Sequence, residues 1–177
     1  LLLVLLFGFN TKPQKLIKEE RERSLNLQIT DISIIRDEAM KTLSSDERSL
    51  IQILQSNVEG AESDSLKIEK LKELSSTWYE LGNFALAGNY AEKIAEKTTK
   101  GESWGIAGTT YAIGITQSTQ EKEKIYCREK ALESLESAIS LEPENVDYQL
   151  NRAVVLAEHP SSDNPMKGIL ILIDLNK

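Results

Sequence analysis

The sequence has few of the residues from which metal sites and nucleophilic sites are usually built. It contains one cysteine, Cys127, and one histidine, His159. This pair cannot supply the four nitrogen and sulfur ligands of a structural zinc site, and the two residues lie far apart in the sequence. A single cysteine forms no intrachain disulfide, so it gives no information on redox compartment. We therefore expect no metal, no cofactor and no catalytic residue.

Aromatic and turn-forming residues are also scarce. Aromatic residues make up 6% of the sequence, which has nine glycines and four prolines. This composition suits helices better than a β-sandwich, which needs many turns and aromatic-rich strands. Hydrophobic residues make up 40% of the 177 positions, which is enough for a core. We therefore predict an all-α protein.

Clustered positive charge is missing as well. The net charge is −7 and the isoelectric point is about 4.9, whereas duplex binding needs a basic face that displaces counterions. Gly101, Gly105 and Gly108 fall at or within a predicted helix, so they indicate close helix packing and not a phosphate-binding loop. We expect no nucleic-acid partner and no enzymatic activity.

An uninterrupted apolar run occupies residues 1–9. A spanning helix needs about 20 such residues, so we expect the chain to begin inside a longer apolar segment. We favour a single N-terminal transmembrane anchor and a membrane-anchored localisation. A signal-peptide core and a buried soluble helix are the alternatives. Residues 10–30 predict a polar tether, whose mixture of lysines and glutamates leaves the side of the membrane undetermined.

The body of the protein is expected to begin at about residue 31. A helical spacing links Ile32, Ile35, Ala39 and Leu43. Ser44 and Glu47 then have the spacing of a capping box, in which each residue satisfies a backbone donor at a helix start. A second apolar face contains Leu50, Ile51, Leu54 and Val58 and ends at Gly60. We predict that residues 31–60 form an antiparallel helical hairpin.

The most informative stretch runs from Trp104 to Pro143. Its first helix presents one large-residue face, formed by Trp104, Ala107 and Tyr111. We expect Trp104 to be buried, and Gly108 to let a neighbouring helix approach the backbone. Its second helix presents a narrow face of Ala131, Leu135 and Ala138. Pro143 prevents this helix from continuing.

This stretch resembles a tetratricopeptide (TPR) unit, whose pattern is Trp-x2-Leu-Gly-x2-Tyr followed by Ala, a bulky residue, Ala and Pro. The resemblance implies a TPR-like helical-hairpin solenoid with about three units, 64–100, 101–143 and 146–177. The order of segments is also similar to small bacterial membrane-anchored TPR proteins. The repeat signature is assigned to Trp78, Trp104, Gly108, Tyr111, Ala131, Ala138 and Pro143.

The middle unit is about eleven residues longer than the family pattern between its two helices. Eleven residues are close to three helical turns, so lengthening both helices would keep their inner faces in register. Ser118 and Glu121 have the spacing of a second capping box. We expect residues 118–130 to form a protruding helical hairpin, which either serves as a docking edge or packs on a neighbouring element.

The TPR resemblance implies a concave groove that binds an extended or helical peptide. Its carboxylate-clamp subset is matched only by Lys72. The groove-facing positions implied are Glu69, Lys72, Ser76, Tyr79, Glu80, Glu102, Gly105, Thr109, Ala112, Asp147, Leu150, Val154 and Glu158.

The functional prediction is a non-catalytic, membrane-tethered scaffold that binds a protein or peptide partner. The alternative is a structural self-association module, a possible homo-oligomer, that uses residues 118–130 and the apolar helix at 166–175. That last helix exposes a surface that needs a partner, so we expect further repeats to follow in a full-length protein.

Overall fold

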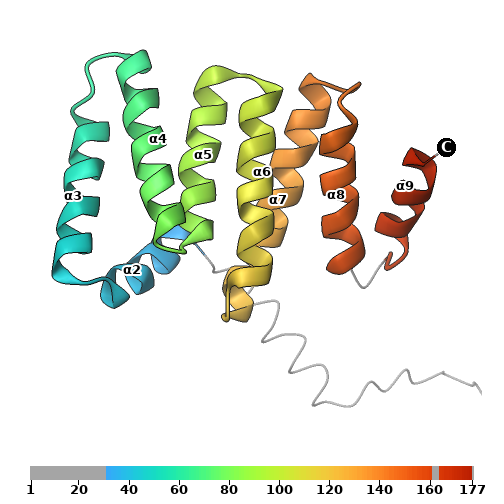
Figure 1. The fold of residues 1–177 in the computed structure, drawn as a ribbon, viewed down its shortest axis with the longest axis horizontal. Helices are drawn as coiled ribbons and strands as arrows, with labels where there is room; N and C mark the ends of the chain where they lie inside the picture. The colour runs from blue at the N-terminus through green and yellow to red at the C-terminus, as the bar shows by residue number, and fades with distance from the viewer. Residues whose placement is uncertain (1–30, 161–163, 177) are drawn as a thin grey trace, which may run out of the picture.

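The computed structural model describes residues 31–160 and 164–176, and within these ranges it contains eight α-helices and no β-strand. The prediction of an all-α fold is confirmed (Figure 1). The helices are α2 (Ile32–Thr42), α3 (Ser45–Glu59), α4 (Asp64–Glu80), α5 (Phe84–Thr98), α6 (Gly101–Gln117), α7 (Glu121–Leu141), α8 (Val146–Glu158) and α9 (Lys167–Leu175).

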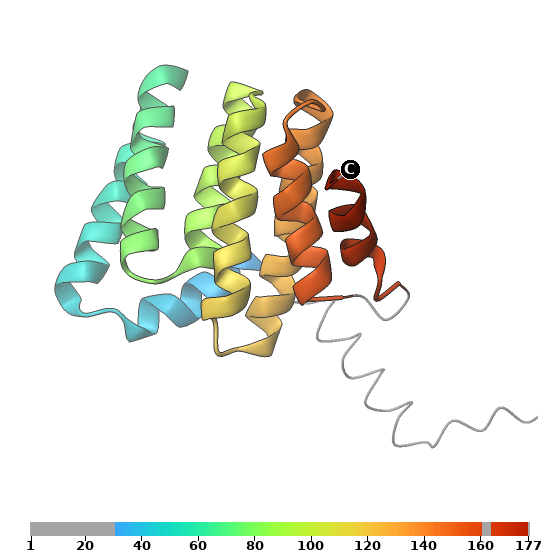
Figure 2. The ribbon, with the colours of Figure 1, turned by 45° about the vertical axis from the view of Figure 1, so that its right-hand side comes forward.

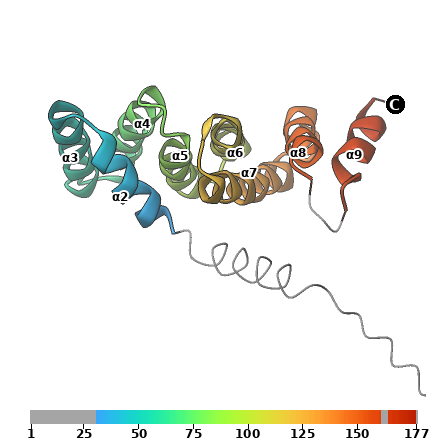
Figure 3. The same cartoon turned by 90° about the horizontal axis from the view of Figure 1, so that it is seen from below.

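The helices from α3 to α9 form a row in which each helix packs on the next. Figure 2 shows α8 and α9 side by side at the end of this row. Seen from below, α4, α6 and α8 lie on one side of the row, and α5 and α7 lie on the other (Figure 3). The α4, α6 and α8 side therefore forms one face of the molecule.

Several helix ends follow the local sequence signals. The backbone N–H of Ser44 donates to Glu47 Oε2 at 2.8 Å, and the backbone N–H of Glu47 donates to Ser44 Oγ at 3.3 Å, so the predicted capping box is confirmed. The hydrogen bonds from Ser44 lower the pKa of Glu47. After α4, Gly82 has a φ of +75°, a left-handed conformation that glycine adopts without a steric cost.

The predicted capping box between Ser118 and Glu121 is wrong. Helix α7 begins at Glu121 with Gln120 as its N-cap, so Ser118 lies too far before the helix to cap it. Its hydroxyl instead donates to Glu123 Oε2 at 2.7 Å. The extra residues nevertheless lengthen α7, which has 21 residues against 15 in α5, whereas α6 has the same 17 residues as α4.

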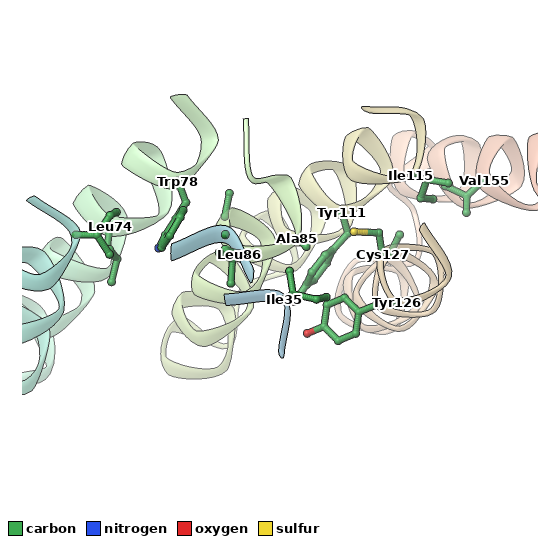
Figure 4. Close-up of a cluster of buried hydrophobic side chains, with 14 of the residues drawn as sticks. Ile35, Leu74, Trp78, Ala85, Leu86, Tyr111, Ile115, Tyr126, Cys127 and Val155 are labelled. Carbon is green, nitrogen blue, oxygen red and sulfur yellow. The ribbon is translucent and has the colours of Figure 1, made fainter. Parts of the chain in front are cut away.

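Helix α2 packs against α5 and does not lie along α3 as the predicted N-terminal hairpin required. Its buried residues Ile35 and Ala39 belong to the same hydrophobic cluster as Tyr126 in the lengthened part of α7 (Figure 4). Glu38 also forms an ion pair with Lys122 at 2.5 Å. The apolar face of α2 is therefore buried against a larger hydrophobic cluster than α3 alone offers. Helix α2 also contacts the 118–130 extension, which we expected to protrude.

The buried side chains extend through α4, α5, α6 and α7 (Figure 4). Trp78 and Tyr111 have no exposed surface. Trp104, in contrast, is partly exposed, so the prediction of a buried Trp104 is wrong. Trp104 lies in the first turn of α6, where a side chain has fewer neighbours than at the middle of the helix.

The prediction of a transmembrane protein is corrected by the structure. Among the helices of residues 31–160 and 164–176, none is both long enough and apolar enough to cross a membrane. The apolar helix α9 has nine residues, whereas a spanning helix needs about 20. The predicted anchor at 1–9 and the predicted tether at 10–30 lie outside the described residues. Within residues 31–160 and 164–176 the structure contradicts the predicted transmembrane span, and with it the membrane-anchored localisation as far as those residues could supply an anchor.

Candidate ligand-binding groove

A hollow of about 500 Å³ lies between α4 and α6, and we name it the α4–α6 hollow. Its floor comes from α5, which contributes the buried side chains of Ala91 and Ile94. Tyr79 of α4 and Ile106 of α6 line its walls with 45% and 54% of their surfaces exposed. The polar residues that also line it are Lys72, Ser75, Ser76, Thr98, Lys100, Glu102, Ser103 and Thr110.

A second hollow of about 210 Å³ lies between α6 and α8, and we name it the α6–α8 hollow. Ile115 and Val155 are buried within it. Its other lining residues are Thr109, Ala112, Ile113, Asn151, Val154, Glu158 and His159. Both hollows use α6, one between α6 and α4 and the other between α6 and α8, and we call the two hollows together the groove of the α4, α6 and α8 face.

Two glycines allow α6 to approach its neighbours closely. A Cβ atom on Gly108 would lie 2.6 Å from Leu135 Cγ of α7, and one on Gly105 would lie 2.5 Å from Tyr148 Cε1 of α8. These distances are too short for any side chain, so both positions need glycine or a shift of the neighbour. The expected close approach at Gly108 is present. Gly105 is buried against Tyr148, so it does not face the groove as expected.

The structure brings eight of the twelve remaining groove candidates into the two hollows. Lys72, Ser76, Tyr79 and Glu102 line the α4–α6 hollow. Thr109, Ala112, Val154 and Glu158 line the α6–α8 hollow. The other four candidates are exposed but line neither hollow, and they are Glu69, Glu80, Asp147 and Leu150.

Three of these four outlying candidates have local roles. Glu69 forms a 3.5 Å ion pair with Lys70. Glu80 accepts a hydrogen bond from the hydroxyl of Ser76 at 3.4 Å. The backbone N–H of Asp147 donates to Asn145 Oδ1 at 3.1 Å, which caps the start of α8. Their side chains or backbones therefore stabilise helices beside the groove.

The sequence-based groove candidates missed eight of the twelve residues that line the α4–α6 hollow, among them Ile106 and Lys100. Ile106 lies one helical turn after the predicted Glu102, so the same helical spacing identifies it. Lys100 precedes α6 as its N-cap residue and makes no side-chain capping hydrogen bond. Its position depends on how α5 ends, where Thr99 adopts a left-handed φ of 53°.

The charges along the groove are unevenly distributed. Lys72 and Lys100 line the α4–α6 hollow, and neither forms an ion pair with any residue of the described ranges. The glutamates near Lys72 are taken by Lys70, which lies 2.7 Å from Glu73 Oε1. This hydrogen bond raises the pKa of Lys70. The lining of the α6–α8 hollow contains Glu158 and neither lysine nor arginine.

Reactive groups are not gathered at the groove. Cys127 is fully buried in α7, and burial raises the pKa of its thiol, which opposes formation of the nucleophilic thiolate. His159 lines the α6–α8 hollow at the end of α8, and its carbonyl accepts a 2.7 Å hydrogen bond from Arg128 Nε. Within the described residues, no three His, Cys, Asp or Glu side chains are grouped as metal ligands.

The chain matches no protein-family model and no curated protein.

Proposed function

We propose that this chain is a non-catalytic protein-interaction module whose α4, α6 and α8 groove binds a peptide segment of a partner protein. The observation that carries the proposal is the α4–α6 hollow, with an apolar floor and two large apolar side chains left exposed beside it. Clefts lined mainly by apolar groups with a few polar groups are typical of ligand sites. The α6–α8 hollow adds a second concave position on the same face, beside the other side of α6.

The packing of the helices supports a TPR-like repeat arrangement. Three consecutive pairs, α4 with α5, α6 with α7 and α8 with α9, pack within themselves and on one another. A glycine lies at a close approach within two of these pairs, Gly108 beside Leu135 and Gly168 beside Ala157, and Gly88 of α5 lies beside Tyr111 of the next pair. In such an arrangement the first helices of successive pairs line one face, and here these are α4, α6 and α8.

Selection from a displayed library of random 12-residue peptides tests the proposal. The affinity of each selected peptide is then measured by fluorescence anisotropy for the unmodified chain and two variants. Ile106→Ala should weaken binding about tenfold, which corresponds to about 1.4 kcal/mol. Ile53→Ala is a matched control, because Ile53 of α3 is 58% exposed and lies outside both hollows.

Three results are decisive in this experiment. A loss of affinity in Ile106→Ala together with unchanged affinity in Ile53→Ala supports binding in the groove. Equal effects of the two substitutions place the peptides elsewhere and reject the proposal. A selection that enriches no peptide above a column without protein rejects it as well.

A second candidate function is self-association through α9. The described part of this helix leaves Leu170 and Ile173 each 54% exposed, and Met166 before it is 51% exposed. Contiguous exposed apolar surface of this kind often marks an interface. The 118–130 extension is less suited to this role because Tyr126 is buried. Light scattering decides, since a monomer at high concentration excludes self-association and a dimer that Leu170→Glu abolishes supports it.

A further inference from the structure

We propose that the peptide bound in this groove places an apolar side chain in the α4–α6 hollow and an acidic side chain beside it, on Lys72 and Lys100. This inference rests on the proposed function and adds the chemical class of the ligand. The acidic group is a side chain within the bound segment. The proposal therefore concerns internal sequence and needs no free chain terminus.

The apolar part of the ligand follows from what the hollow exposes. Ala91 and Ile94 form a floor that retains 4% and 8% exposure, so the bottom of the hollow is hydrocarbon. Ile106 stands at one wall with more than half of its surface in water. Tyr79 stands at the other wall, where its ring is fixed by an edge-to-face contact with Phe84 at 5.0 Å. An apolar side chain between these walls removes both surfaces from water.

The acidic part of the ligand is inferred from the two lysines, which form no ion pair with any described residue. On α4, the residues one turn after Lys72 are Ser75 and Ser76, which are uncharged. Glu69, one turn before Lys72, is paired with Lys70. No carboxylate of the described residues therefore lies within ion-pair distance of the Lys72 ammonium group.

Lys100 is free for a related reason. Its neighbour Lys97 takes the carboxylate of Asp64 at 2.7 Å, and Lys100 has no ion pair among the described residues. Glu102 also lines the hollow, so the two lysines leave one positive charge in excess there. A carboxylate of the ligand in this hollow is attracted by the ammonium groups of both lysines, one from α4 and one from the residue that precedes α6.

The neighbouring hollow provides an internal contrast. The α6–α8 hollow is also lined by apolar side chains between two helices, but its charged lining residue is Glu158. An acidic side chain is therefore repelled from this end of the groove and attracted to the other. The chain as a whole has a net charge of −7, so its overall charge does not attract acidic peptides. The attraction to an acidic side chain comes from the local positions of Lys72 and Lys100.

The test uses the random 12-residue library with a constant linker at both ends, so that no displayed segment has a free carboxyl terminus. It is screened against the unmodified chain, against Lys72→Glu/Lys100→Glu, and against the control Lys41→Glu/Lys167→Glu. The control changes the net charge by the same amount at two exposed lysines outside the groove. Circular dichroism checks that each variant is folded.

The unmodified chain and the control should enrich peptides that combine an apolar residue with Asp or Glu one or two positions away. The groove variant should enrich the same apolar residue with Lys or Arg, and its affinity for the acidic peptides should fall at least tenfold. If the double charge reversal does not fold, Lys72→Gln/Lys100→Gln replaces it. That variant should lose the acidic preference without gaining a basic one.

Two outcomes overturn the inference while leaving the proposed function intact. One is a set of apolar peptides without acidic enrichment whose binding is lost in Ile106→Ala. The other is an acidic preference that persists unchanged in the groove variant. An absence of any peptide that depends on Ile106 rejects the proposed function itself, and the inference is rejected with it.

Discussion

The hydroxyl of Tyr111 in α6 donates a 2.7 Å hydrogen bond to Glu92 Oε2 in α5. The other carboxylate oxygen of Glu92 lies 3.1 Å from Lys130 Nζ in α7. The Glu92 side chain is only 13% exposed, so its charge needs both partners. Three consecutive helices, α5, α6 and α7, are thus joined at one largely buried carboxylate.

Removal of this hydroxyl should destabilise the fold. Tyr111→Phe removes the hydroxyl donor and leaves Oε2 of the largely buried Glu92 carboxylate without this hydrogen bond. We therefore expect a loss of about 1–3 kcal/mol in the free energy of unfolding. Urea denaturation followed by circular dichroism measures the loss. Tyr148→Phe is a matched control, because Tyr148 also donates to a glutamate, Glu142, at 3.1 Å but lies nearer the surface. A control that loses as much as Tyr111→Phe would contradict this assignment.

Stability should fall in alkaline solution because two buried groups in α7 resist ionisation. Burial raises the pKa of Cys127 from its ordinary value of 9.0, and burial raises the pKa of Tyr126 from 10.0 to about 12. The folded chain therefore keeps protons that the unfolded chain releases. The contribution of these groups is fully present below the unfolded pKa values, and is lost as the pH rises from about 9 through the folded values.

Urea midpoints between pH 7 and pH 11 test this pH dependence. One group in its titrating range changes stability by at most about 1.4 kcal/mol per pH unit. Cys127→Ala should remove the part of the decline that begins near pH 9. Tyr126→Phe should reduce the part that begins near pH 10, to which Tyr111 also contributes because burial raises its pKa. Declines that are identical in all three chains would show that other groups cause the alkaline loss.

The two tryptophans should differ in their contribution to stability. Trp78 is fully buried among α4 and its neighbours, so Trp78→Ala should cost about 3–5 kcal/mol by loss of burial and creation of a cavity. Trp104 is partly exposed, so Trp104→Ala should cost clearly less. Chemical denaturation of both variants under the same conditions gives the comparison. A larger loss of stability in Trp104→Ala than in Trp78→Ala would mean that α6 is rotated about its own axis in solution, so that Trp104 is buried.

Gly168 should be required for α9 to pack on α8. A Cβ atom at Gly168 would lie 2.3 Å from the backbone N of Ala157 and 2.6 Å from the carbonyl oxygen of Ala153. Backbone atoms cannot yield as a flexible side chain does, so Gly168→Ala should displace α9. Hydrogen exchange of α9 amides should become faster while that of α5 amides is unchanged.

Gly101→Ala is the control for this substitution. There the added Cβ would meet the far end of the Glu142 side chain, whose Cδ lies 2.5 Å away. That side chain can rotate, so exchange in α6 should change little. If the α9 amides of Gly168→Ala remain protected from hydrogen exchange, α8 and α9 pack less closely in solution than they do in the structure.

Local sequence determined the all-helical fold and much of the groove. Helical spacing depends on each segment alone, so the capping box at Ser44 and the close-approach position Gly108 were readable from the chain. The TPR resemblance supplied the eight candidates that line the two hollows. It did not identify Lys100 or Ile106, because the family pattern that supplied the groove positions has no place for them.

The tertiary structure decided which surfaces meet. Sequence proximity favoured pairing of α2 with α3, yet α2 packs on α5, where Ile35 joins a larger apolar cluster. Trp104 has the residue type of a core position, but its place in the first turn of α6 leaves it partly exposed. The freedom of Lys72 and Lys100 also depends on ion pairs formed by Lys70 and Lys97. Each of these outcomes depends on competition among contacts across the whole chain, which residue spacing does not encode.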